Sequence, residues 1–122
     1  MELIYKDLSY KIVGLAMQAH RELGPGFLEK VYENALMVLF RNEQIQAEQQ
    51  SSIKVFFQNE IVGNYIADIL VEDKIILELK TVDKITDVHK AQAINYLKAT
   101  GLHLAMIFNF HSQSLEYERI VL

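Results

Sequence analysis

The sequence contains no cysteine, which excludes disulfides, thiolate metal sites and cysteine nucleophiles. It holds only one proline and five glycines, so a collagen-like or a Pro/Gly-rich disordered chain is excluded as well. No apolar run reaches roughly eighteen residues, the length that membrane spanning requires, and the first residues lack a basic segment followed by an apolar core. These absences lead us to expect a soluble, cytoplasmic protein.

An excess of positive charge is also missing. The chain has 12 Lys and Arg against 16 Asp and Glu, a net charge of −4 at pH 7. The field of the whole molecule therefore repels polyanions, and any nucleic-acid site must be a local basic patch. The chain does have 51% apolar residues in a length of 122, which predicts a single domain over residues 1–122 with a substantial core.

Apolar residues recur at helical spacing on both sides of a break at residues 24–26, Gly-Pro-Gly. The first run predicts a helix over residues 9–23 that stops at the glycine. The second run predicts a helix over residues 27–42. The apolar stripe that we expect to face the core in this second helix consists of Leu28, Val31, Ala35, Val38 and Leu39.

The composition then changes to β-branched and aromatic runs, which are typical of strands. The predicted strands cover residues 53–57, 61–71, 75–82, 103–110 and 115–122. A helix over residues 88–100, ended by Gly101, separates the third strand from the fourth. The element order is α-α-β-β-β-α-β-β, and because the intervening helix is long enough for a crossover, it predicts an α/β fold with a mixed sheet flanked by helices.

Three charged residues stand out in the apolar strand segments 66–71 and 75–80. If residues 72–74 form a three-residue turn, Asp68 lies directly opposite Glu78. Lys80 points to the same face as Glu78, because side chains alternate along a strand. Two like charges at this separation destabilise each other unless a cation lies between them.

Two interpretations of this group remain open. It is either a structural cluster of ion pairs, in which Lys80 neutralises the carboxylates, or a metal site. In a metal site Asp68 and Glu78 supply hard oxygen ligands to Mg²⁺, with Mn²⁺ as a substitute. Lys80 then orients or deprotonates the attacking water, and the metal stabilises negative charge on a phosphate.

Two predicted helices offer further candidates. Glu29 becomes a third potential metal ligand if its helix lies beside the strand carboxylates, whereas we expect Glu33 to be solvated. Gln92 and Tyr96 stand four residues apart on the helix that must cover the sheet. Of these two, Gln92 is the better candidate for a contact with the site.

Four separated motifs carry a family resemblance. Asp68 with Glu78-Leu79-Lys80 resembles the PD-(D/E)XK nuclease motif, with Ala67 in the place of the motif's proline. Residues 26–32, Gly-Phe-Leu-Glu-Lys-Val-Tyr, are similar to the signature of the GxxExxY proteins, a small bacterial and archaeal group assigned to that superfamily. The likeness continues through residues 89–101.

This resemblance implies a restriction-endonuclease-like α/β fold. It implies that Asp68 and Glu78 are metal ligands and that Lys80 activates water. Glu29 matches the acidic residue that the superfamily often places on its first core helix, facing the site. Gln92 matches a polar position that often lies near the active site.

The leading hypothesis is therefore a metal-dependent nuclease that hydrolyses phosphodiester bonds in DNA, in preference to RNA. The isolated acidic chain should bind nucleic acid weakly unless dimerisation or a partner supplies basic surface. The apolar segment 115–122 predicts a homodimer through an exposed strand edge. The alternative is a non-catalytic interaction or regulatory module that retains a nuclease-like fold, although the intact residues Asp68, Glu78 and Lys80 argue against it.

Overall fold

A computed structural model describes residues 3–122, which form three helices and five strands. The helices are α1 (Lys6–Leu23), α2 (Glu29–Asn42) and α3 (Asp87–Thr100). The strands are β1 (Ala47–Phe57), β2 (Glu60–Val71), β3 (Ile75–Lys80), β4 (Leu104–Asn109) and β5 (Glu116–Val121). The predicted order α-α-β-β-β-α-β-β is confirmed, and the fold is the expected restriction-endonuclease-like α/β arrangement.

The five strands form one mixed sheet in the order β1-β2-β3-β4-β5. Neighbouring strands run antiparallel except β3 and β4, which are parallel. The chain passes between those two strands through α3, which is the predicted crossover. β1 begins at Ala47 rather than at residue 53, because the polar segment that precedes residue 53 continues the strand with alternating exposed and half-buried side chains.

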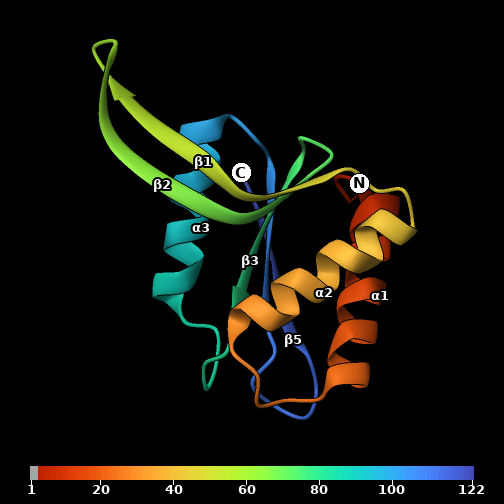
Figure 1. The fold of residues 1–122 in the computed structure, drawn as a ribbon. Coiled ribbons are helices and arrows are strands. Elements are labelled where there is room, and N and C mark those ends of the chain that lie inside the picture. Colours follow the sequence, from red (N-terminus) through yellow and green to blue (C-terminus); the bar gives the residue numbers. More distant parts are fainter. Residues whose placement is uncertain (1–2) are drawn as a thin grey trace.

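Helices cover both faces of the sheet (Figure 1). On one face, α1 and α2 pack against side chains such as Leu77 and Met106. On the other face, α3 places Leu97 against Ile76 and Ile107. The central strands β3 and β4 are therefore buried on both sides, which accounts for their almost continuous apolar sequence. No helix within residues 3–122 combines the length and the apolarity needed to cross a lipid bilayer.

The inward face of α2 differs from the predicted one. Its buried side chains are Tyr32, Glu33, Leu36 and Phe40. In the predicted stripe, Leu28, Val31 and Val38 are exposed, whereas Ala35 and Leu39 are half-buried. Apolar residues occur around most of this helix, so their spacing alone does not fix its rotation. Turning the two aromatic rings inward removes the largest apolar surface from water.

Tyr32 stabilises the connection between α1 and α2. Its ring is buried and stacks on Phe110 with 4.4 Å between the ring centroids. Its hydroxyl donates to the Gly24 carbonyl at 2.6 Å and accepts from the Phe27 N–H at 3.3 Å. A tyrosine at this position therefore stabilises the turn that precedes α2, which is a structural role for the last residue of the segment 26–32.

Candidate functional site

The candidate site lies where β2 separates from β3. The ladder between them pairs Val71 with Ile75 and continues through Ile69, which pairs with Leu77. This register is the one predicted from a three-residue turn. The ladder ends there, so Asp68 and Glu78 are the next residues on the two strands, one on each side of the widening gap.

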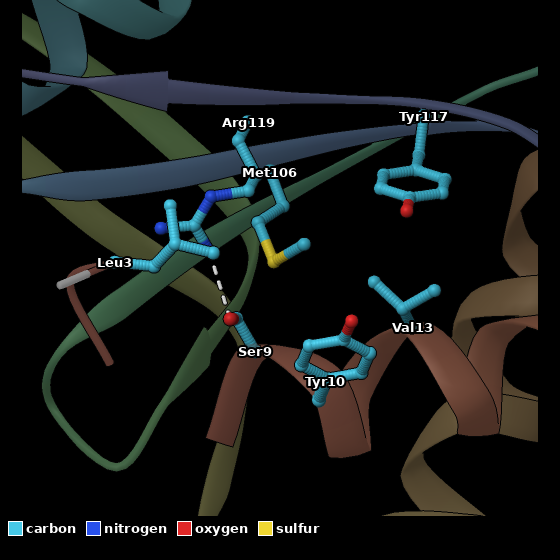
Figure 2. A pocket seen from close by; sticks show the side chains of 7 residues that line it. All are labelled: Leu3, Ser9, Tyr10, Val13, Met106, Tyr117 and Arg119. Atoms are coloured by element: carbon cyan, nitrogen blue, oxygen red, sulfur yellow. Dashed lines mark hydrogen bonds between the residues drawn. The ribbon is translucent and has the colours of Figure 1, made fainter. Parts of the chain in front are cut away.

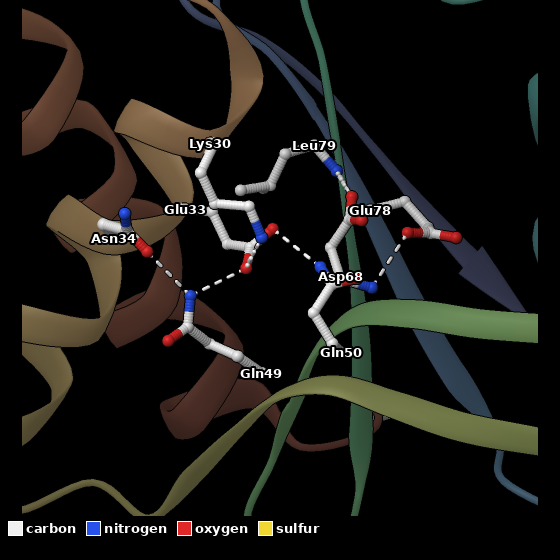
Figure 3. Close-up of polar contacts among 8 residues, drawn as sticks. All are labelled: Lys30, Glu33, Asn34, Gln49, Gln50, Asp68, Glu78 and Leu79. Carbon is white, nitrogen blue, oxygen red and sulfur yellow. Dashed lines mark hydrogen bonds and ion pairs between the residues drawn. The ribbon is translucent and has the colours of Figure 1, made fainter.

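In this gap the two carboxylates accept hydrogen bonds from backbone N–H groups, in place of the pairing between the backbones of β2 and β3. Asp68 Oδ2 accepts a hydrogen bond from the Leu79 N–H at 2.7 Å, and Glu78 Oε2 accepts one from the Asp68 N–H at 3.2 Å (Figure 3). Each side chain therefore reaches across to the opposite strand. The sequence placed both carboxylates in adjacent strands, and the structure brings them together.

The environment of Glu78 opposes its ionisation. Its side chain is almost buried, with 9% of the residue exposed. Burial raises the pKa of Glu78 from 4.5 to about 8, with further upward contributions from the charge of Asp68 and from a carboxyl hydrogen bond to Asp68. Without a cation, the pair therefore holds a proton near neutral pH.

Lys80 lies close enough to influence this pair. Its charge lowers the pKa of Glu78, although this is the smallest of the contributions. The side chain is half-buried. Within residues 3–122, Lys80 makes no ion pair shorter than 4.0 Å. The structure thus lacks the direct contact that a purely structural Asp-Glu-Lys ion cluster requires.

α3 contributes Tyr96 to the surroundings of the carboxylates. Tyr96 is buried, and its pKa is raised by that burial and then by the nearby charges of Glu78 and Asp68. Gln92 is exposed and donates from its amide to the Tyr96 hydroxyl at 2.9 Å. Tyr96 is therefore the residue of α3 whose pKa the two carboxylates raise, and Gln92 is connected to them through its hydrogen bond to Tyr96.

The two acidic residues at the start of α2 have different surroundings. Glu29 is exposed and accepts a hydrogen bond from the Thr81 hydroxyl at 2.9 Å, which connects the helix to the residue that follows β3. Glu33 is only 3% exposed. The expectation that Glu33 is solvated was wrong, because the rotation of α2 turns this position toward the sheet.

One ammonium group and two side-chain amides donate hydrogen bonds to the Glu33 carboxylate. Gln49 and Lys30 donate to Oε2 at 2.7 Å and 3.0 Å, and Gln50 donates to Oε1 at 3.0 Å. Both oxygens of a buried carboxylate are thus satisfied (Figure 3). This cluster was not apparent from the sequence, because two successive glutamines in a strand are expected to point to opposite faces.

The chemistry of the donors fits a divalent cation. Asp68 and Glu78 are paired oxygen donors whose charges need compensation, and hard cations prefer such ligands. Within the described residues 3–122, no group of three or more His, Asp or Glu side chains is arranged to hold a metal ion. Glu29 and Glu33 therefore do not join the strand carboxylates in this structure.

A hollow in the molecule lies away from these residues. It has a volume of about 140 Å³ and lies between α1 and strands β4 and β5 (Figure 2). Its one charged lining side chain, Arg119, donates to the Ser9 hydroxyl at 2.8 Å and to the Ile4 carbonyl at 2.9 Å. These bonds fasten the N-terminal segment to β5, so Arg119 has a structural role there.

The domain combines a mixed sheet flanked by helices with two opposed carboxylates and a neighbouring lysine, at the point where β2 separates from β3. This combination is typical of a nuclease-like α/β domain. The chain matches the PD-(D/E)XK nuclease superfamily over residues 6–120, and it belongs to this superfamily. It also resembles the crystal structure of SSO0001, with 18% sequence identity and a TM-score of 0.60. That similarity covers 76% of this chain and 50% of SSO0001, so the chain spans half the length of that protein. No curated protein matches the chain.

Proposed function

We propose that this domain is a metal-dependent nuclease that hydrolyses phosphodiester bonds, in DNA rather than RNA. The observation that carries the proposal is the pair of carboxylates of Asp68 and Glu78, each of which accepts a backbone hydrogen bond from the opposite strand in the gap between β2 and β3. Stability alone does not explain an almost buried Glu78 beside a half-buried Asp68, because the repulsion between the two carboxylates and the desolvation of Glu78 oppose folding. Membership of the nuclease superfamily supports the same conclusion.

The proposed ligands of Mg²⁺ are Asp68 and Glu78, and Mn²⁺ is expected to substitute for it. When bound, the ion supplies positive charge that stabilises the phosphate as negative charge develops on it. Glu29 is proposed as a third ligand. It does not join the strand carboxylates in this structure, and its hydrogen bond is with Thr81, the residue that follows Lys80.

Lys80 is the residue proposed to act on water. Its ammonium makes no ion pair within residues 3–122, so its protons are available to hydrogen-bond a water molecule and turn it toward the phosphorus. Gln92 supports the site from α3 by donating to the hydroxyl of Tyr96. That bond orients the Tyr96 hydroxyl, whose pKa is raised by burial and by the charges of Glu78 and Asp68.

The net charge of −4 limits how tightly the isolated domain holds nucleic acid. We therefore expect weak binding with a shallow salt dependence. A homodimer would add surface, and β5 supplies an edge for it, because this strand lies at the end of the sheet with Val121 58% exposed. The same acidic charge favours the second candidate, a non-catalytic interaction module with a nuclease-like fold.

Cleavage assays at low salt separate the two functions. Labelled single-stranded, duplex and branched DNA and single-stranded RNA are incubated with Mg²⁺ or Mn²⁺ and the wild type, Asp68→Asn or Glu78→Gln. Glu48→Gln is the matched control, since it makes the same change at an exposed position of β1. We expect cleavage of DNA by the wild type and the control, with loss in both site variants.

Two other results contradict this proposal. Equal activity in all four proteins means that the cleavage comes from a contaminant or from another site. No cleavage by any of them, together with no Mn²⁺ binding in calorimetry, leaves the interaction module as the better interpretation.

A further inference from the structure

Gln50 adopts an unusual backbone conformation in the middle of β1. Its φ is 53°, in the left-handed region that residues other than glycine rarely occupy. Strand residues normally have extended backbone with negative φ. A conformation of this kind inside a strand persists only where surrounding contacts enforce it.

The contacts that enforce it come from Glu33. Gln49 and Gln50 both donate to its buried carboxylate, at 2.7 Å and 3.0 Å (Figure 3). Side chains of adjacent residues in a regular strand point to opposite faces, so one carboxylate on one helix could not normally bond both. The left-handed residue breaks the alternation, and the bond to Glu33 holds Gln50 in that state.

The kink at Gln50 lies level with Asp68. The ladder of β1 and β2 pairs Gln49 with Ile69 and Ser51 with Ala67, and it skips the pair between them, Gln50 and Asp68. The ladder of β2 with β3 ends next to the same position. At Asp68, β2 therefore misses one pair with β1 and stops pairing with β3.

The two strands bend together at this level. Beyond it, β1 and β2 remain paired with each other and curve away from β3 toward α3 (Figure 1). Ile53 and Ala67, from the two strands, pack there in the cluster that α3 covers. Without this bend, β2 would continue alongside β3 and close the gap that contains the carboxylates of Asp68 and Glu78.

We propose that Gln50 is a positioning residue for the cation site, and that Glu33 acts through it. The left-handed backbone of Gln50, held by Glu33, bends the β1–β2 hairpin at Asp68 and keeps the gap between β2 and β3 open. This inference rests on the proposed function, because it assigns the open gap to a divalent cation held by Asp68 and Glu78.

Substitutions at Gln50 separate its backbone from its side chain. Gln50→Gly removes the bond to Glu33 but favours the left-handed conformation. Gln50→Val removes the same bond and resists that conformation, because a β-branched side chain favours extended backbone. Ser52→Val is the matched control at an exposed position of β1 whose φ is not positive.

The readout is Mn²⁺ binding by calorimetry, with melting temperatures and circular dichroism of each metal-free protein alongside. We expect Gln50→Gly and Ser52→Val to bind Mn²⁺ within about threefold of the wild type. Gln50→Val should bind at least tenfold more weakly while its melting temperature stays at or above that of Gln50→Gly. A merely structural role would lower stability and affinity together in both variants.

Glu33→Gln provides a second, independent measurement that does not depend on the folding of Gln50→Val. It should weaken Mn²⁺ binding threefold or more, but by less in the Gln50→Gly background, because glycine keeps the kink without Glu33. If the wild type binds Mn²⁺ and both Gln50→Val and Glu33→Gln bind equally well, the positioning role is overturned and the metal site stands. If the wild type binds no Mn²⁺, the proposed function fails and this inference fails with it.

Discussion

Replacing Glu78 by glutamine should stabilise the metal-free protein at alkaline pH and leave it unchanged at acidic pH. In the folded protein the pKa of Glu78 is raised from 4.5 to about 8, mainly by burial and by the charge of Asp68. Between these two pH values the folded state binds one more proton than the unfolded state. Stability that comes from this proton is complete below pH 4.5 and is lost as the pH rises through about 8.

The size of the effect follows from this shift. Each pH unit across the window changes the free energy of unfolding by about 1.4 kcal/mol. From pH 5 to pH 8 the wild type should thus lose up to roughly 4 kcal/mol that Glu78→Gln keeps. For a domain of this size, 1 kcal/mol corresponds to about 4 °C in melting temperature. The expected gain of Glu78→Gln at pH 8 is then on the order of 10–15 °C.

Thermal melts in EDTA at several pH values between 5 and 9 measure this difference. The comparison removes the contribution of titrating groups that do not interact with Glu78, because those groups are the same in both proteins. Glu48→Gln, which makes the same change at an exposed position, should follow the wild type throughout. If the difference in melting temperature between Glu78→Gln and the wild type stays constant from pH 5 to pH 8, the proposed burial of a protonated carboxyl group is refuted.

Three further substitutions test other parts of the site. Lys80→Ala should abolish cleavage but leave Mn²⁺ affinity within about threefold in calorimetry, because Lys80 is proposed to act on water; a large loss of affinity would contradict that role. Tyr32→Phe removes two hydrogen bonds of the α1–α2 connection and should lower the free energy of unfolding in urea by about 1–2 kcal/mol, with cleavage retained. Asn109→Ala leaves the Val82 N–H and carbonyl without their partner and should cost roughly 2–3 kcal/mol in the same measurement; a change below 0.5 kcal/mol would show that water replaces the amide.

The element order and the register of the central hairpin were predictable from the sequence. The apolar segments of β2 and β3 are separated by residues 72–74 only, and a turn of that length leaves one register that places Asp68 opposite Glu78. β3 is buried on both faces, and a shift of its pairing with β2 by one residue would turn Asp68 and Glu78 to opposite faces of the sheet. For this reason the sequence alone predicts that the two carboxylates lie side by side.

The rotation of α2 and the kink at Gln50 were not predictable in the same way. α2 has apolar side chains on both its buried and its exposed sides, so the helical period identifies the helix but not its inward face. Left-handed backbone is signalled in a sequence by glycine or asparagine, and glutamine gives no such signal. Glu33 enforces that conformation through a tertiary contact, which one sequence does not reveal.

If a divalent cation binds Asp68 and Glu78 as proposed, it competes with a proton for the same carboxylate oxygens. Asp68 and Glu78 each accept a hydrogen bond from the opposite backbone through one oxygen, at 2.7 Å and 3.2 Å, and burial and the charge of Asp68 raise the pKa of Glu78. Binding a divalent ion between them must therefore release that proton. Below the pKa of about 8 the affinity for Mn²⁺ should rise by up to tenfold per pH unit, because each unit lowers the cost of removing the proton by about 1.4 kcal/mol.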